Sequence, residues 1–264
     1  MRKVNYSPVA NGPLLLKLQE RGIEMPYLLV LAHEVLRTPD AFLELLVGRD
    51  SDVVILDNGV VELGEPLEFE QLWKAASIVF PDYIVCPDIQ YDAEATLQAT
   101  AVWCEEYHSR SDFGSIKPAL MGVAQGKSAA EAIKCAERLR NFTDAIGIPK
   151  LIKDRHAVVR EVQHMGFEFI HLLGFGDPLC DLAAMCASAE VLGIDSAVPL
   201  HLALMGRECT VEDLLNPPMR RSMYWGLLNY AEYDLSEELI NRCVANIAQY
   251  NEIVKQEMLH SMED

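Results

Sequence analysis

The chain has 264 residues, half of them apolar, and a formal net charge of −18. This length suffices for one large barrel or two modest domains, and the composition is that of an ordinary soluble globular protein. Met1-Arg2-Lys3 is followed by Val-Asn-Tyr-Ser-Pro rather than an apolar segment, and the apolar run at 27–32 is too short to span a bilayer. We therefore expect a cytoplasmic protein without a signal peptide or a membrane partner.

Apolar runs that end on a polar residue or a glycine recur along the chain and predict strands. The first spans 27–32, and another is predicted near 223–227. The six runs between them close on Asp57, Asp88, Gln125, Gly147, Gly174 and Asp195.

Segments of helical spacing alternate with these runs. Ser128, with Glu131 three residues on, forms a capping-box pattern, and Asp154 opens another helix. Asp177-Pro178 places proline in the first turn of a further helix, where its missing donor costs nothing. The predicted helices cover 70–79, 93–107, 128–140, 154–164, 177–189 and a long C-terminal segment from 236 to about 258.

Alternating strands and helices predict a parallel α/β fold, and eight strands close naturally into a (β/α)8 TIM-like barrel. An open doubly wound sheet is the alternative, but the chain has no Gly-rich dinucleotide fingerprint. No linker, repeat or low-complexity segment interrupts the pattern, so residues 1–264 are predicted to form a single barrel domain with an added C-terminal helix.

The acidic balance counts against nucleic-acid binding, because Lys and Arg contacts to phosphate normally supply most of the affinity. Two local groups oppose it: Lys150, Lys153 and Arg155 share one loop-to-helix segment, and Arg220 and Arg221 are adjacent. These groups form either ordinary solvated surface or a basic rim around an acidic body. A basic partner protein is a further possible source of positive charge.

The cysteine and histidine patterns predict neither a disulfide framework nor a metal site. The seven cysteines are odd in number and form no CxC or CxxC pair, so free thiols in a reducing compartment are expected. No Cys/His group has zinc spacing, and His33-Glu34 lacks a second histidine four residues on. No cofactor is predicted.

The carboxyl ends of barrel strands meet at one face, so Asp57, Asp88 and Asp195 are expected to share a pocket. Each aspartate alone could merely satisfy backbone amides, and Gly174-Phe-Gly176 is only a weak phosphate signal. Together, however, three aspartates repel one another unless a ligand or a catalytic role compensates. A carboxylate pair flanking a glycosidic bond fits this set, with one attacking the anomeric carbon and the other exchanging protons. The third aspartate, Gln125 and the Gly147 backbone offer the donors and acceptors that a purine edge requires.

The order of these segments resembles the queuine tRNA-ribosyltransferase (tRNA-guanine transglycosylase) superfamily over roughly residues 50 to 206. No single match decides the resemblance, but all six occur in order. The matching segments are Asp57-Asn58-Gly59, Asp88, Ala124-Gln125-Gly126-Lys127, Ile146-Gly147-Ile148-Pro149, Leu172-Leu173-Gly174-Phe175-Gly176-Asp177-Pro178 and Asp195-Ser196-Ala197-Val198-Pro199-Leu200-His201.

The resemblance implies a pentosyltransferase that exchanges one base for another. Asp195 would attack C1′ of the target nucleotide to form a covalent intermediate, and Asp57 would serve as the acid and base. Substrate binding would fall to Asp88, Gln125, Gly147 and Gly174. No cofactor is implied, because one glycosidic bond replaces another.

Departures from the family pattern alter the implied substrate. Only Cys209 and Cys243 follow Asp195, so the zinc subdomain of the tRNA enzymes is missing. The family's RNA-reading arginines are replaced by His201 and Leu204, its stacking aromatic by Val61 and its base-covering methionine by Leu173.

These losses resemble the bacterial and phage branch that inserts 7-deazaguanines into DNA. The implied partners are DNA and a free 7-deazaguanine base, with a homodimer or a basic partner protein also open, in a bacterium or a phage-infected cell. A tRNA enzyme, a non-catalytic nucleic-acid-binding member and an unrelated barrel enzyme acting on a nucleobase, sugar or phosphate ester remain alternatives. Glu62, His33 and His171 have no assigned role.

Overall fold

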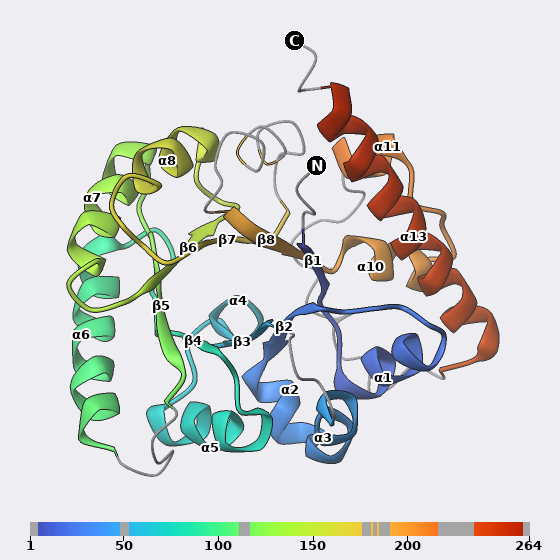
Figure 1. Cartoon of the computed structure of the whole chain (residues 1–264), viewed down its shortest axis with the longest axis horizontal. Coiled ribbons are helices and arrows are strands. Elements are labelled where there is room, and N and C mark those ends of the chain that lie inside the picture. Colours follow the sequence, from blue (N-terminus) through green and yellow to red (C-terminus); the bar gives the residue numbers. More distant parts are fainter. Residues whose placement is uncertain are drawn as a thin grey trace.

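The computed structural model describes residues 5–47, 53–110, 117–175, 181, 184, 191–215 and 235–260. Eight parallel strands form a nearly closed barrel surrounded by helices (Figure 1), which confirms the predicted (β/α)8 fold. The strands are β1 (Asn5–Pro8), β2 (Tyr27–Leu31), β3 (Val53–Asp57), β4 (Tyr83–Val85), β5 (Ala119–Val123), β6 (Ala145–Pro149), β7 (Ile170–Leu173) and β8 (Val191–Ser196).

The helices follow the strands in the alternation that the sequence predicts. Residues 181 and 184, between β7 and β8, are also helical. The helices are α1 (Gly12–Glu20), α2 (Ala32–Arg37), α3 (Pro39–Leu46), α4 (Val60–Leu63), α5 (Phe69–Val79), α6 (Ala93–Ser109), α7 (Ala129–Leu139), α8 (Arg155–Val162), α10 (Val198–Leu204), α11 (Val211–Leu215) and α13 (Glu237–His260).

The run that begins at Tyr27 is the second strand of the barrel, because β1 precedes it. The sequence Asn5-Tyr6-Ser7-Pro8 contains no apolar run, so periodicity does not reveal this strand. It forms because it pairs with β8 in parallel, with Ser7 opposite Asp195. The strand predicted near 223–227 lies outside the described residues.

The barrel closes between β1 and β2 through a side chain. These two strands stand at opposite ends of the hydrogen-bonded order and contact each other. The buried hydroxyl of Ser7 accepts a hydrogen bond from the Leu29 N–H at 2.7 Å. Ser7 therefore substitutes for a backbone acceptor at this seam.

Replacing Ser7 by alanine is expected to lower the free energy of unfolding by about 1–3 kcal/mol, because the buried Leu29 N–H loses its acceptor. Urea denaturation measures the difference. Ser77→Ala is the matched control, since the Ser77 hydroxyl donates to Lys74 O on the exposed face of α5. Equal effects of the two substitutions would mean that the Ser7 contact does not close the barrel.

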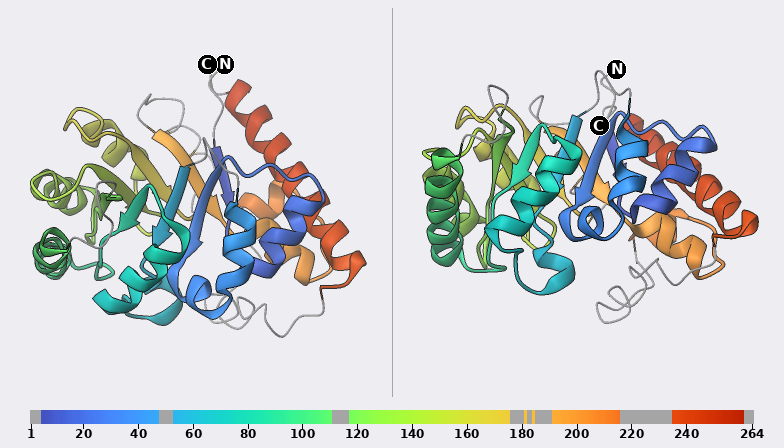
Figure 2. Two further views of the ribbon diagram at one scale, coloured as in Figure 1. Left: turned by 60° about the horizontal axis from the view of Figure 1, so that its bottom comes forward. Right: turned by 90° about the horizontal axis from the view of Figure 1, so that it is seen from below.

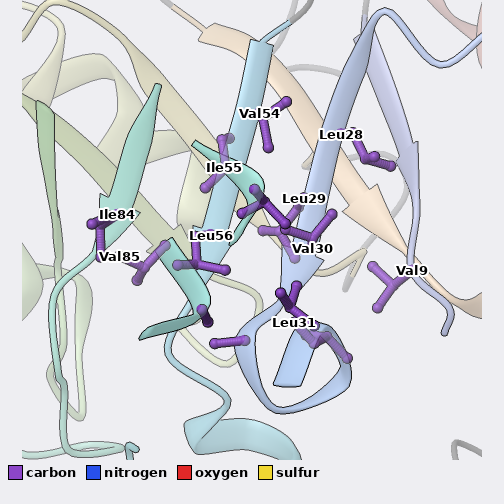
Figure 3. Close-up of a cluster of buried hydrophobic side chains, with 14 of the residues drawn as sticks. Val9, Leu28, Leu29, Val30, Leu31, Val54, Ile55, Leu56, Ile84 and Val85 are labelled. Atoms are coloured by element: carbon purple, nitrogen blue, oxygen red, sulfur yellow. The ribbon is translucent and has the colours of Figure 1, made fainter. Parts of the chain in front are cut away.

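Apolar side chains fill the barrel and the space between strands and helices. Leu29 and Leu31 line the cavity described below, so alternation turns Leu28 and Val30 toward the surrounding helices. Figure 3 shows the side chains of β2, β3 and β4 packed against one another.

Gly193 on β8 admits the ring of Tyr27 to the barrel interior. A Cβ at Gly193 would lie 2.6 Å from Tyr27 Cε1, so only glycine allows this approach. The Tyr27 side chain is fully buried as a result.

The C-terminal helix α13 packs on the outside of the barrel against α1 and α10 (Figure 2), as the sequence predicts. Ser128 caps α7 by accepting the Glu131 N–H, although the Glu131 carboxylate binds the Lys127 N–H instead of completing the box at Ser128. Asp154 precedes α8 in a left-handed conformation, with φ of 57°, and makes no side-chain cap. Most of the helix predicted at 177–189 lies outside the described residues.

The five described cysteines are buried and free of disulfides, namely Cys86, Cys104, Cys135, Cys209 and Cys243. Cys180 and Cys186 lie outside the described part of the chain. Within the described residues, no helix combines the length and apolarity needed to cross a membrane.

Candidate active site

A cavity of about 780 Å³ opens at the carboxyl ends of the strands. Its lining includes five of the residues that the sequence assigns to a site, which are Asp57, Asp88, Gln125, Gly174 and Asp195. Gly147 is not among the lining residues. It lies within β6, where its carbonyl accepts the Ala124 N–H at 2.9 Å, and the lining on this strand begins at Pro149.

Asp195, near the end of β8, is held through one oxygen. Its Oδ1 accepts the Gly174 N–H at 2.8 Å and lies 2.9 Å from His171 Nε2. The described residues donate no hydrogen bond to Oδ2, and the side chain is 13% exposed. The carboxyl group is therefore fixed in orientation and presents its second oxygen to the cavity.

His171 is oriented from the other side by Tyr27. The Tyr27 hydroxyl lies 2.5 Å from His171 Nδ1, and both side chains are buried. Burial, followed by the charge of Asp195, raises the pKa of Tyr27 well above its ordinary value, so the hydroxyl keeps its proton as a donor. A donor at Nδ1 leaves the imidazole proton on Nε2, where it is directed at Asp195.

Gly174 adopts a left-handed conformation, with φ of +69°, directly after β7. This backbone turn points its N–H at Asp195. The positive φ favours glycine here, and a Cβ would also lie 2.8 Å from Lys150 Cδ, so the lysine side chain would have to move.

Asp57 ends β3 and is 9% exposed. Its Oδ2 accepts the Gly59 N–H at 2.9 Å. Burial raises the pKa of Asp57 to about 7, with the charges of Asp88 and Asp195 adding to the rise against the opposing effect of that hydrogen bond. A carboxyl group with this pKa gives up and takes back a proton readily near neutral pH.

Asp88 and Gln125 form a hydrogen-bonded pair on the neighbouring strand ends. Asp88 Oδ1 accepts from Asn58 Nδ2 at 2.7 Å, and Oδ2 accepts from Gln125 Nε2 at 2.6 Å. Gln125 Oε1 in turn accepts the Tyr91 N–H at 3.0 Å. Burial raises the pKa of Asp88, and the two amide donors oppose that rise.

Both polar groups of this pair keep unused capacity. Each carboxylate oxygen has a second lone pair, and an amide nitrogen has a second proton. The pair therefore presents two acceptors and one donor side by side, in an orientation that its protein contacts fix.

Glu62 contributes a fourth carboxyl group, from α4. Viewed as in Figure 1, α4 projects onto the middle of the strand ring. The Oε2 atom of Glu62 is buried and has no hydrogen-bond partner among the described residues. Burial, and then the charges of Asp57 and Asp195, raises the pKa of Glu62 well above its ordinary value.

The opposite wall of the cavity, after β6, carries positive charge. Lys150, Lys153 and Arg155 all line it. Arg155 is 3% exposed and donates from Nη1 to Gly174 O at 2.7 Å and to Asp181 Oδ1 at 3.1 Å.

The sequence pattern assigns no role to Glu62 or His171 and does not single out Tyr27. His171 is not among the cavity-lining residues, but it shares a strand face with Leu173, which is, so alternation along β7 was the available signal. His33 does not line the cavity. Its Nε2 lies 3.8 Å from Glu34 Oε1, and burial followed by the Arg37 charge lowers its pKa to about 4.

Among the residues that the structure describes, no three His, Cys, Asp or Glu side chains are grouped so as to hold a metal ion. No protein-family model and no curated protein matches the chain.

Proposed function

We propose that this protein is a DNA-guanine transglycosylase, which exchanges guanine in DNA for a 7-deazaguanine derivative. The observation that carries the proposal is that Asp195 and Asp57 line the same cavity. Asp195 Oδ2 accepts no hydrogen bond from the described residues, and Asp57 has a pKa of about 7. One carboxyl group is suited to attack and the other to proton transfer, as exchange of a glycosidic bond requires.

In the first half of the reaction, Asp195 Oδ2 attacks C1′ of the target nucleotide. A bond forms between this oxygen and C1′ as the bond between C1′ and N9 breaks. The electron pair of the broken bond leaves with guanine, and protonated Asp57 gives its proton to the departing base. The sugar is then esterified to Asp195, and Asp57 is a carboxylate.

The second half reverses these steps with a different base. Asp57 takes the proton from N9 of the incoming 7-deazaguanine, and N9 attacks C1′. The ester bond breaks and its electron pair returns to Asp195. Asp57 is again protonated, so one cycle consumes neither a proton nor a cofactor.

Asp88 and Gln125 are suited to read the base. Guanine and 7-deazaguanine both present N1–H and N2–H as adjacent donors beside the O6 acceptor. The remaining lone pairs of Asp88 match the two donors, and the second amide proton of Gln125 matches O6. No contact among the described residues supports the role that the resemblance assigns to Gly147.

The resemblance favours DNA over tRNA, and the placement of three substituted residues supports this choice. Val61 and Leu173 line the cavity at the positions of the family's aromatic and methionine. His201, at the position of an RNA-reading arginine, is 1% exposed, and burial followed by the Lys150 charge lowers its pKa to about 3. A buried neutral imidazole is a poor replacement for an arginine on phosphate.

Incubation with labelled guanine and either DNA or tRNA tests the proposal. We expect label to enter DNA and not tRNA, and to enter single-stranded DNA faster, because the target base must leave the stack at a cost of a few kcal/mol. Mass analysis of digested nucleosides after incubation with a 7-deazaguanine should reveal the modified deoxynucleoside. Exchange into tRNA alone, or into neither nucleic acid, would contradict the proposal.

A further inference from the structure

The cavity has an acidic side and a basic side. Asp57 ends β3, and Glu62 and Asp88 follow β3 and β4. The basic residues Lys150, Lys153 and Arg155, here called the basic wall, follow β6. We propose that the basic wall binds a backbone phosphate of the DNA strand next to the target nucleotide. This inference rests on the proposed function and adds a binding site to it.

Arg155 is a buried cation with spare donors. Its Nη1 is occupied by Gly174 O and Asp181, but Nε and Nη2 have no hydrogen-bond partner among the residues that the structure describes. Leaving buried guanidinium donors unpaired is costly. Phosphate oxygens match the planar fork of an arginine. Both donors have almost no accessible surface, so the guanidinium has to turn toward the cavity to bind a phosphate.

Lys150 places positive charge over the cavity. Its side chain passes so close to Gly174 that a Cβ there would lie 3.4 Å from Lys150 Cε. The Lys150 charge also opposes the raised pKa of Glu62 and adds to the lowered pKa of His201, so it acts on both sides of the cavity.

Lys153 is exposed at the cavity, and no described carboxylate forms an ion pair with it. Asp154 and Asp181 also line the cavity and offset part of the charge of the basic wall. Asp181 forms an ion pair with Arg155 and not with Lys153. The exposed Lys153 ammonium is therefore accessible to an incoming strand.

Gly174 connects the basic wall to the proposed nucleophile. Its N–H donates to Asp195 and its carbonyl accepts from Arg155. Gly174 is therefore hydrogen-bonded to both side chains. In a nucleotide, only the sugar separates C1′ from the phosphates. A nucleotide with C1′ at Asp195 and its base at Asp88 therefore brings a phosphate to the basic wall.

This arrangement also explains how a chain with a net charge of −18 can hold DNA. Affinity depends on the cations that meet phosphates, rather than on the total charge. The acidic side of the cavity repels the backbone and accepts the base, which orients the strand.

Binding of a labelled single-stranded oligodeoxynucleotide with one guanine, measured at several salt concentrations, tests the site. We expect Lys153→Glu to weaken binding about tenfold and to reduce the slope of log affinity against log salt by about 0.7, the value for one phosphate contact on a single strand. Lys74→Glu makes the same charge change on the exposed face of α5, away from the cavity, and should leave both quantities unchanged.

Equal affinities and slopes for the two variants would overturn the inference. So would binding that depends on Lys153 for an RNA strand but not for DNA, or a site that inorganic phosphate fills as tightly as the oligonucleotide. The phosphate site and the proposed function can be contradicted independently. DNA binding that needs Lys153, without any guanine exchange, would support the phosphate site and contradict the transglycosylase activity. Guanine exchange by the wild type, with no effect of Lys153→Glu on DNA affinity, would support the transglycosylase activity and contradict the phosphate site.

Discussion

Replacing Asp195 by asparagine is expected to lower guanine exchange by roughly 10⁴-fold or more, the scale seen when a catalytic nucleophile is removed. The amide oxygen can still accept from Gly174 N–H and His171, so the local structure should remain. The amide is not a nucleophile, and no ester with C1′ can form. Single-turnover exchange of labelled guanine and the yield of a covalent protein–DNA adduct measure the two effects.

Asp92→Asn is the matched control for this substitution. Asp92 caps α6 by accepting the Ala95 N–H, and asparagine caps helices equally well. The control should exchange guanine at the wild-type rate, and both variants should unfold at the wild-type denaturant concentration. An active Asp195→Asn enzyme would show that the nucleophile is wrongly assigned.

The barrel could be predicted because most of its strands are apolar runs that end on a polar residue or a glycine. Val53–Asp57 and Ala119–Val123 are examples in which composition alone defines the strand. β1 could not be found in this way, since Asn5–Pro8 has no such run. Long-range contacts hold it instead, including the hydrogen bond from the Tyr6 hydroxyl to Ser196 O at 2.8 Å.

The cavity could be predicted only where a residue stands at a strand end. Asp57, Asp88 and Asp195 line it because parallel strands share one carboxyl face. Sequence cannot reveal which polar atoms remain unpaired, so the open side chain of Glu62 and the spare donors of Arg155 appear only in three dimensions. Gly147 shows the limit of the rule, because the cavity begins two residues beyond it.

Asp57 should make the fold less stable as the pH rises. Its pKa is about 7 in the folded protein, against 3.8 ordinarily. The folded state therefore favours the protonated form, and that stabilisation is complete below about 3.8 and lost as the pH rises through 7. Because one pKa unit corresponds to about 1.4 kcal/mol, the ionised group costs the fold at most about 4 kcal/mol.

Asp57→Asn is accordingly expected to abolish exchange and yet to stabilise the protein at pH 8, by about 2–4 kcal/mol relative to wild type. Asparagine keeps the acceptor for Gly59 N–H but cannot carry the transferred proton. Urea denaturation at pH 5 and pH 8 measures the gain, which should shrink at the lower pH. If Asp57→Asn is no more stable than wild type at pH 8, the carboxyl group ionises freely in the fold and is not the acid of the reaction. A gain would mean that the protein gives up stability to keep a proton on Asp57, the group that donates it to the leaving base in the proposed reaction.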